Sequence, residues 1–227
     1  MTISSASIET KIELTDARPF ILCIENPKEY YKVVKEMIAS FQGEISEFTF
    51  WEDDEKVSAE KAGEILVDLF SFELTDKKIM MLLYKQLQRN FNERDMIFEF
   101  QKVKAESEKF LLELCATVDF TLEYSEIELE SFLKVCSVRP ENNYQTLLEK
   151  IICYLNIFAE LKRTRCFAFV GLKTVLSEED LRLLYRHCRL HKLSLLLIEC
   201  GKIRPILSEE RAIIITDDLC EIVENFE

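Results

Sequence analysis

The residues of this sequence best suited to chemistry are carboxylates in one short acidic stretch. VDFTLEYSEIELES, residues 118–131, contains five acids and no basic residue. These acids are Asp119, Glu123, Glu126, Glu128 and Glu130. Oxygen ligands at this density can hold calcium, although the stretch lacks the D-x-[DN]-x-[DN]-G pattern of an EF-hand. Because acids are also typical of a helix N-terminus, calcium binding and a plain acidic helix start both stay open.

Basic residues are concentrated elsewhere, in residues 160–211. This region holds eleven Lys and Arg against seven acids, a local balance of +4 in a chain whose net charge is −13. The clearest groups precede a strand-like run or fall at i, i+4 and i+7 of a helix: Lys162, Arg163 and Arg165, then Arg182, Arg186 and Arg189. Such groups can follow the phosphates of a nucleic acid. The alternative is a solvated face balanced by acidic neighbours.

The junction FILCIENPKEYYKVV, residues 20–34, lies where an α/β protein often carries a phosphate-binding loop. A phosphate cradle needs glycines and a helix N-terminus with free N–H groups. This turn has no glycine; Asn26 predicts an N-cap, Pro27 removes a donor, and Glu29 adds negative charge. The sequence also lacks the P-loop, GxGxxG, G-x-S-x-G and H-E-x-x-H motifs. We therefore expect a binding or scaffolding protein and not an enzyme.

The composition is typical of a folded cytoplasmic protein. The 227 residues are 48% hydrophobic and 31% charged, which suits a large core. No apolar run of about 18 residues predicts a membrane span, and the first residues lack a secretory pattern. Eight cysteines without a CxxC pair predict reduced, mostly buried thiols.

Apolar periodicity predicts strands towards both ends of the chain and helices between them. The predicted strands are residues 8–14, 20–25, 48–53, 64–70, 166–171, 193–199 and 212–216. The predicted helices are residues 30–41, 75–91, 94–118, 126–136 and 143–161, and one that opens at Ser177 with Asp180 three residues later. This order predicts an α/β head domain from residues 1–75 and 162–227, with residues 76–161 inserted as an α-helical leg domain.

Several stretches, in this order, resemble the type II-A CRISPR-associated spacer-acquisition proteins of the second Csn family. They are FILCIENPKEYYKVV, TLEYSEIELESFLK, KRTRCFAFVGLKTVLSEEDL and LSLLLIE, and the L-E-Y-x-E-I step is the most specific. The match covers nearly the whole chain. The resemblance implies a mostly parallel sheet similar to that of RecA-like and other P-loop NTPases, without the phosphate loop, and with an inserted helical leg.

The resemblance also implies a function in CRISPR adaptation, the acquisition of spacers for antiviral defence. Proteins of this family are non-enzymatic homotetrameric rings that bind double-stranded DNA ends sequence-independently through a basic hole, supported by Ca²⁺. They act beside the CRISPR integrase complex and the effector nuclease. Two other classes remain open: a degenerate NTPase-fold enzyme with a non-standard nucleotide site, and a protein-only interaction scaffold.

Carried over position by position, the resemblance assigns two kinds of site. Glu123 and Glu126 match acids of the calcium region, and Asp119 is an alternative ligand because Thr121 and Ser125 occupy two other acidic positions. The implied DNA-binding residues, extended by the helix stripe, are Lys134, Arg139, Lys162, Arg163, Arg165, Arg182 and Arg186. A basic hole inside an acidic ring would reconcile DNA binding with the net charge of −13.

Overall fold

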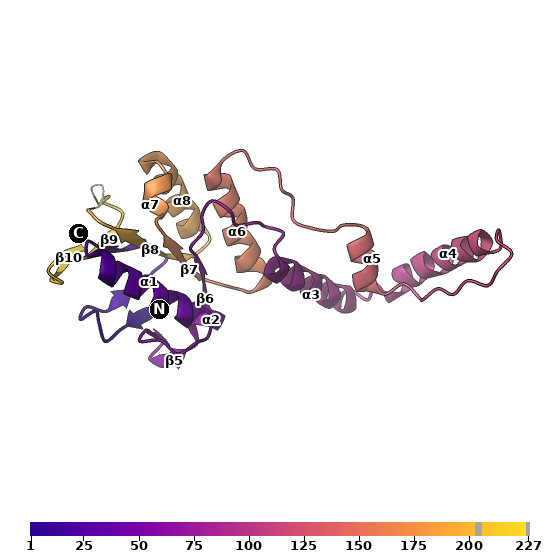
Figure 1. The fold of residues 1–227 in the computed structure, drawn as a ribbon, viewed down its shortest axis with the longest axis horizontal. Helices are drawn as coiled ribbons and strands as arrows, with labels where there is room; N and C mark the ends of the chain where they lie inside the picture. Colours follow the sequence, from indigo (N-terminus) through magenta and orange to yellow (C-terminus); the bar gives the residue numbers. More distant parts are fainter. Residues whose placement is uncertain (203–205, 226–227) are drawn as a thin grey trace. The chain divides into compact units, whose positions relative to one another are not determined.

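The chain folds into two compact units in the computed structural model, which describes residues 1–202 and 206–225 (Figure 1). The first unit joins Met1–Glu73 to Asn143–Glu227, and the second is Leu74–Asn142. The boundary that we expected at residue 161 differs from this division. Helix α6 (Leu147–Leu161) belongs to the first unit, because its residues Ile151, Tyr154, Leu155 and Phe158 are buried there.

Six strands form the main sheet of the first unit, in the order β10-β9-β3-β8-β7-β6. Their bounds are Phe20–Ile24 (β3), Gly63–Leu66 (β6), Cys166–Val170 (β7), Ser194–Cys200 (β8), Arg211–Ile215 (β9) and Glu221–Asn225 (β10). All neighbouring strands are parallel except β9 and β10. The prediction of an α/β protein with a mostly parallel sheet is therefore confirmed.

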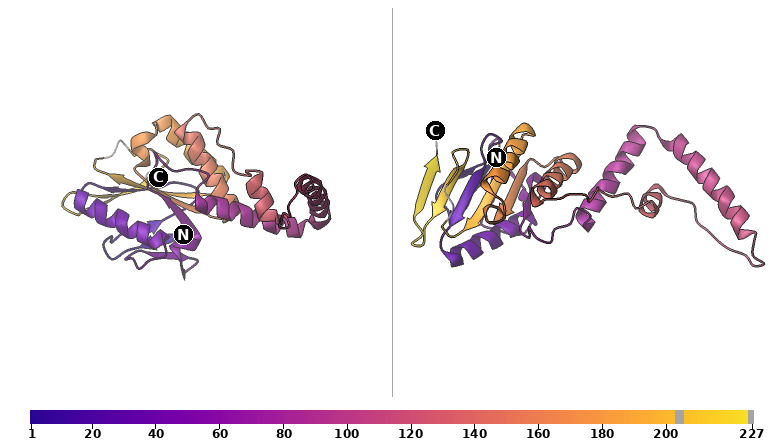
Figure 2. Two further views of the ribbon diagram at one scale, coloured as in Figure 1. Left: turned by 45° about the vertical axis from the view of Figure 1, so that its right-hand side comes forward. Right: turned by 90° about the horizontal axis from the view of Figure 1, so that it is seen from above.

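Helices cover both faces of this sheet (Figures 1 and 2). On one face, Leu22 and Ile198 share a core with Val33 and Met37 of α1 (Pro27–Phe41). On the other face lie α6 and α8 (Glu178–Leu190), and the rings of Tyr154 and Phe167 are 6.3 Å apart. The continuous apolar strands follow from this double coverage, because a parallel sheet buries both sets of alternating side chains.

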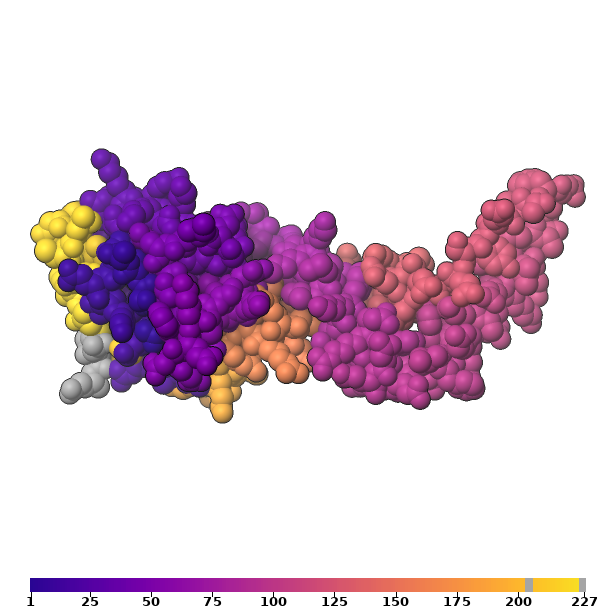
Figure 3. All heavy atoms as spheres, turned by 90° about the horizontal axis from the view of Figure 1, so that it is seen from below, coloured from indigo at the N-terminus to yellow at the C-terminus, as the bar shows by residue number. Residues whose placement is uncertain are grey.

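A second, antiparallel sheet in the order β2-β1-β4-β5 completes the first unit. Its strands are Thr2–Ser4 (β1), Ile12–Glu13 (β2), Thr49–Glu52 (β4) and Glu55–Val57 (β5). Asp53 and Asp54 form the β4–β5 turn with positive φ, a conformation that Asp tolerates better than most residues. The view from below shows the N-terminal segments, including this sheet, over much of the visible surface of the unit (Figure 3).

Three helices form the second unit: α3 (Lys77–Glu93), α4 (Ile97–Cys115) and α5 (Leu129–Val135). The predicted helices are confirmed with shifted ends. Helix α3 begins after Asp76, whose side chain caps it by accepting the N–H of Ile79 at 2.8 Å. The short helices α2 (Ala59–Ala62) and α7 (Leu172–Val175) of the first unit were not predicted. None of the described helices combines the length and apolar character needed to span a membrane.

All eight cysteines are free thiols. The expectation that most are buried is wrong, because only Cys23, Cys166 and Cys188 are buried.

Candidate nucleic-acid interface

The N-terminus of α1 is closed by its own cap. The side-chain oxygen of Asn26 accepts the N–H groups of Lys28 at 3.0 Å and Glu29 at 3.2 Å, as the sequence predicts. The Asn26 amide also donates to the carbonyl of Asp217 at 3.2 Å, which fixes the side chain in place. Because an anion at this turn would need these same N–H groups, the geometry offers no phosphate cradle.

Three basic residues lie at the amino ends of two adjacent strands, β7 and β8. Arg163 and Arg165 precede β7, Lys192 precedes β8, and all three side chains are exposed. Parallel pairing aligns Cys166 with Ser194, whose N–H donates to the carbonyl of Arg165 at 2.7 Å. This register brings the two segments together, although 26 residues lie between Arg165 and Lys192 in the sequence. We call Arg163, Arg165 and Lys192 the edge cluster.

Lys162 does not belong to the edge cluster, although the sequence grouped it with Arg163 and Arg165. Its ammonium binds the Glu64 carboxylate at 2.5 Å and the Gly63 carbonyl at 3.1 Å. Only 18% of the Lys162 side chain and 6% of the Glu64 side chain are exposed. The residue ties the end of α6 to β6, which argues against a contact between Lys162 and DNA.

The arginines of α8 lie on its exposed side, as their spacing predicts. The helix buries Leu181, Leu184, Tyr185 and Cys188 on the opposite side. Arg182 is partly neutralised by an ion pair with Glu209. Within the part of the chain that the structure describes, Arg186 forms no ion pair, and it lies nearer the end of α8 that leads to Lys192. Arg186 is therefore the better candidate for a phosphate contact.

The remaining predicted DNA-binding residues lie in the second unit. Lys134 on α5 is exposed and pairs with Glu130, one helical turn earlier, at 2.6 Å. The hydrogen bond and charge of Glu130 raise the pKa of Lys134, which therefore stays protonated at neutral pH. Arg139 follows α5 and is exposed.

The acids of the acidic stretch lie along an exposed segment. Asp119, Glu123 and Glu126 are exposed in the segment between α4 and α5, and Glu126 pairs with Lys104 of α4 at 3.0 Å. Among residues 1–202 and 206–225, no group of three or more His, Cys, Asp or Glu could hold a metal ion. The donor set that calcium needs, six to eight oxygens, is thus not assembled by these carboxylates.

A buried polar network at the carboxyl ends of β7 and β8 was not anticipated. Glu210 is fully buried and binds the ammonium of Lys173 at 2.6 Å and the hydroxyl of Tyr185 at 2.6 Å. Glu199 accepts the N–H of Lys173 at 2.8 Å, and burial raises the pKa of Glu199 to about 7. The network joins the segment before β9 to α7 and α8.

Comparison with known proteins places this chain in a family. The sequence profile of the family described as CRISPR-associated protein (Cas_Csn2) matches residues 40–219. A CRISPR-associated protein Csn2 of Streptococcus agalactiae is 25% identical over 182 residues, 79% of this chain and 80% of that protein. A CRISPR-associated protein Csn2 of Enterococcus faecalis is 19% identical over 206 residues, 88% of this chain and 90% of that protein.

A solved structure shares the fold. Stu0660 of Streptococcus thermophilus aligns with a TM-score of 0.57 at 15% sequence identity, over 100% of this chain and 76% of that one. Profile, relatives and fold together define a CRISPR-associated protein of mixed α/β architecture. The chain belongs to the Csn2 family, as its sequence motifs predict.

Proposed function

We propose that this chain is a non-enzymatic protein of CRISPR adaptation that binds double-stranded DNA ends as a homotetrameric ring. Its partners in spacer acquisition are the CRISPR integrase complex and the effector nuclease. The edge cluster carries the proposal. Arg163, Arg165 and Lys192 are exposed at one edge of the sheet, and none of them forms an ion pair with another described residue. Three such cations in a chain of net charge −13 favour an anionic partner.

The chemistry of the edge cluster suits phosphates rather than bases. Guanidinium and ammonium groups on an exposed edge bind phosphate oxygens, which carry no sequence information. Each phosphate contact releases counterions, so the logarithm of the affinity falls with a slope of about −0.9 per contact against the logarithm of salt concentration. Repetition of the cluster in a symmetric ring would multiply a modest charge into a positive channel.

The second unit supports self-association. Helix α4 buries none of its 19 residues, and it exposes Phe98, Phe110, Leu112 and Leu114. Helices in proteins gain most of their stability from packing of an apolar face, and exposed apolar residues along a helix are typical of an interaction surface. A second copy of the chain would cover them.

Calcium binding is not part of this proposal. Among the described residues, no group of three or more acids is arranged to hold a metal ion, and Glu126 is paired with Lys104. Calcium support of the assembly stays a prediction from the resemblance, with Asp119, Glu123 and Glu126 as its candidate ligands.

Charge reversal tests the proposal. Fluorescence anisotropy with labelled duplexes of two unrelated sequences would compare the wild-type protein with Arg163→Glu/Arg165→Glu and Lys134→Glu/Arg139→Glu. We expect both pairs to weaken binding at least tenfold, equally for both sequences. Lys35→Glu/Lys61→Glu, which makes the same change of charge at exposed positions of α1 and α2, is the control. Wild-type affinity in both test pairs, or a loss confined to one sequence, would contradict phosphate binding.

A further inference from the structure

A hollow of about 590 Å³ lies on the outer face of the small antiparallel sheet. Strands β1, β2 and β4 and the β4–β5 turn supply most of its lining. Ile3, Ile12 and Phe50 are register partners in these strands and are buried in the core, so that the alternate residues face outward. The edge cluster lies elsewhere, at the amino ends of β7 and β8, and the proposed function therefore leaves this hollow without a role.

Trp51, the only tryptophan of the chain, is the aromatic residue of the hollow. Its indole N–H donates to the hydroxyl of Ser4 on the neighbouring strand at 3.2 Å, which holds the ring in place. The residue is 38% exposed. Because the N–H is already bound within the sheet, the ring offers a ligand its π face. Such a face attracts cations, above all the flat guanidinium group of arginine, which stacks on it.

The turn that follows Trp51 concentrates negative charge. It contains four consecutive acids, residues 52–55, and the register of β4 and β5 places Glu52 directly opposite Glu55. Like charges in this arrangement destabilise a hairpin. Asp53 and Asp54 line the hollow, are exposed, and form no ion pair with another described residue. A cation bound beside them would reduce the repulsion within the turn.

The basic groups of the lining lie away from the acidic turn or are bound elsewhere. The N-terminal ammonium donates to the carbonyl of Leu14 at 3.2 Å. Thr2 on β1 is the register partner of both Glu13 and Trp51, and β2 and β4 run in the same direction. Lys11 comes two residues before Glu13, whereas the turn comes after Trp51. The lysine and the acidic turn therefore lie at opposite ends of the hollow.

We propose that this hollow is a docking site for an arginine-bearing segment of a partner protein. The guanidinium group stacks on the face of Trp51, and its N–H groups donate to the carboxylates of Asp53 and Asp54. Arginine suits the site better than lysine, because its planar fork can stack on a ring and bind a carboxylate at the same time. A nucleic acid does not suit it, because the acids of the turn repel phosphates. The chain thus has a protein-binding surface opposite in charge to the edge cluster.

The single tryptophan makes binding at this site directly measurable. Titration of the full chain with a peptide of sequence GRGRG, blocked at both ends, should change the fluorescence of Trp51 in a saturable way. The matching peptide GKGKG should bind several-fold more weakly. Anisotropy of a fluorophore-labelled GRGRG peptide follows variants that lack the tryptophan.

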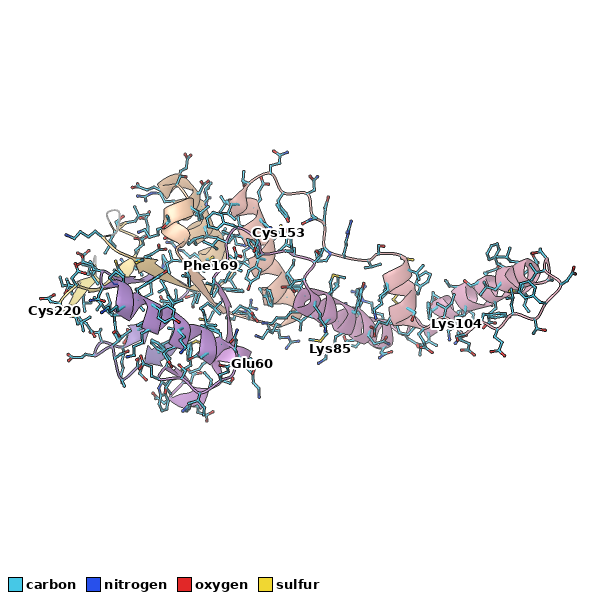
Figure 4. The ribbon with its side chains drawn as sticks, viewed as in Figure 1. Glu60, Lys85, Lys104, Cys153, Phe169 and Cys220 are labelled. Atoms are coloured by element: carbon cyan, nitrogen blue, oxygen red, sulfur yellow. The ribbon has the colours of Figure 1, made fainter. Side chains whose placement is uncertain are left out.

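Two variants and a matched control locate the peptide. Asp53→Asn/Asp54→Asn and Trp51→Leu should each bind GRGRG about fivefold more weakly or less tightly still. Asn tolerates positive φ as Asp does, so the turn is retained. Glu44→Gln/Glu60→Gln makes the same change of charge at exposed positions outside the hollow and should bind as the wild type does (Glu60 is labelled in Figure 4). Circular dichroism verifies that each variant folds.

Several results would overturn the inference. Fluorescence of Trp51 that does not respond to GRGRG contradicts it, and so does peptide binding that both variants leave unchanged. Equal affinity for GRGRG and GKGKG would mean that only general charge attraction acts. If a single-stranded oligonucleotide changed the fluorescence and GRGRG did not, the hollow would be a base-stacking surface instead. Duplex binding is measured separately, so that its loss would contradict the proposed function and leave this inference standing.

Discussion

The ammonium nitrogen of Lys173 lies 2.6 Å from a carboxylate oxygen of Glu210, and both side chains are buried. The Tyr185 hydroxyl donates to the other Glu210 oxygen at 2.6 Å. The N–H of Leu207 donates at 2.8 Å to the same oxygen that Lys173 contacts. Lys173 lies on α7, which follows β7, and Glu210 immediately precedes β9. The pair therefore holds the β8–β9 connection against α7 and α8.

Replacement of Lys173 by methionine should destabilise the protein strongly. The change leaves the Glu210 carboxylate buried without its ion-pair partner, a loss of about 3–5 kcal/mol in the free energy of unfolding. Denaturant unfolding measures it, with the exposed Lys35→Met as control. A loss below about 1 kcal/mol would mean that the segment before β9 relaxes and that the pair does not hold it.

The carboxyl group of Glu199 should make stability depend on pH. Burial raises its pKa from 4.5 to about 7, so the folded state binds a proton more tightly than the unfolded state. The contribution of this proton binding to the free energy of unfolding is fully present below about pH 4.5 and is lost as the pH rises through about 7. Glu199→Gln should therefore stabilise the protein at pH 8, by about 2–3 kcal/mol, and leave it nearly unchanged at pH 5.

Thermal unfolding of the wild-type protein and of Glu199→Gln between pH 5 and pH 8 measures this difference in stability. A gap that stays constant over the whole range would contradict it, since only the titration of Glu199 predicts a gap that grows with pH.

The sequence predicts local structure here far better than it predicts the candidate site. The Asn26 cap, the helix predicted over residues 30–41 and the Ser177 cap depend on neighbouring residues and are confirmed. The Ser177 hydroxyl accepts the N–H of Asp180 at 3.1 Å. Strand β10 was missed because it is an edge strand, with Ile222 and Val223 about half exposed, and backbone pairing to β9 defines it. Such pairing leaves little apolar pattern in a sequence.

Tertiary contacts decide which basic residues are free to contact DNA, and such contacts leave no pattern in the neighbouring sequence. Lys162 and Arg163 are neighbours in sequence, yet Lys162 binds Glu64 across 98 residues while Arg163 is exposed. Lys192 joins the edge cluster only through the register of β7 and β8. A single lysine in a turn gives no sequence pattern that would predict its place beside Arg163 and Arg165. Only the pairing of the folded strands shows it.

Lys104 should limit calcium binding by the acidic stretch. Its ammonium lies 3.0 Å from Glu126 and competes with any cation for that carboxylate. If the stretch binds calcium, Lys104→Met should raise the affinity several-fold, and Glu123→Gln/Glu126→Gln should lower it. Calorimetric titration with calcium measures both, with Glu9→Gln as a control outside the stretch. Equal affinities in all four proteins would place calcium elsewhere.

ATP should leave the protein unaffected. Asn26 occupies the N–H groups that a phosphate would need at α1, so we expect no shift in thermal unfolding with ATP and magnesium, and no release of phosphate. A shift of several degrees with phosphate release would support a degenerate NTPase instead.

Comparison of linear and covalently closed circular duplexes tests the central proposal most directly. A ring that threads DNA ends needs a free end, whereas a flat basic surface does not. At equal base-pair concentration, the account predicts binding to the linear duplex and at least tenfold weaker binding to the closed circle, with affinity restored when the circle is cut once. Equal affinity for the linear and the closed circular duplex would contradict end binding by a ring.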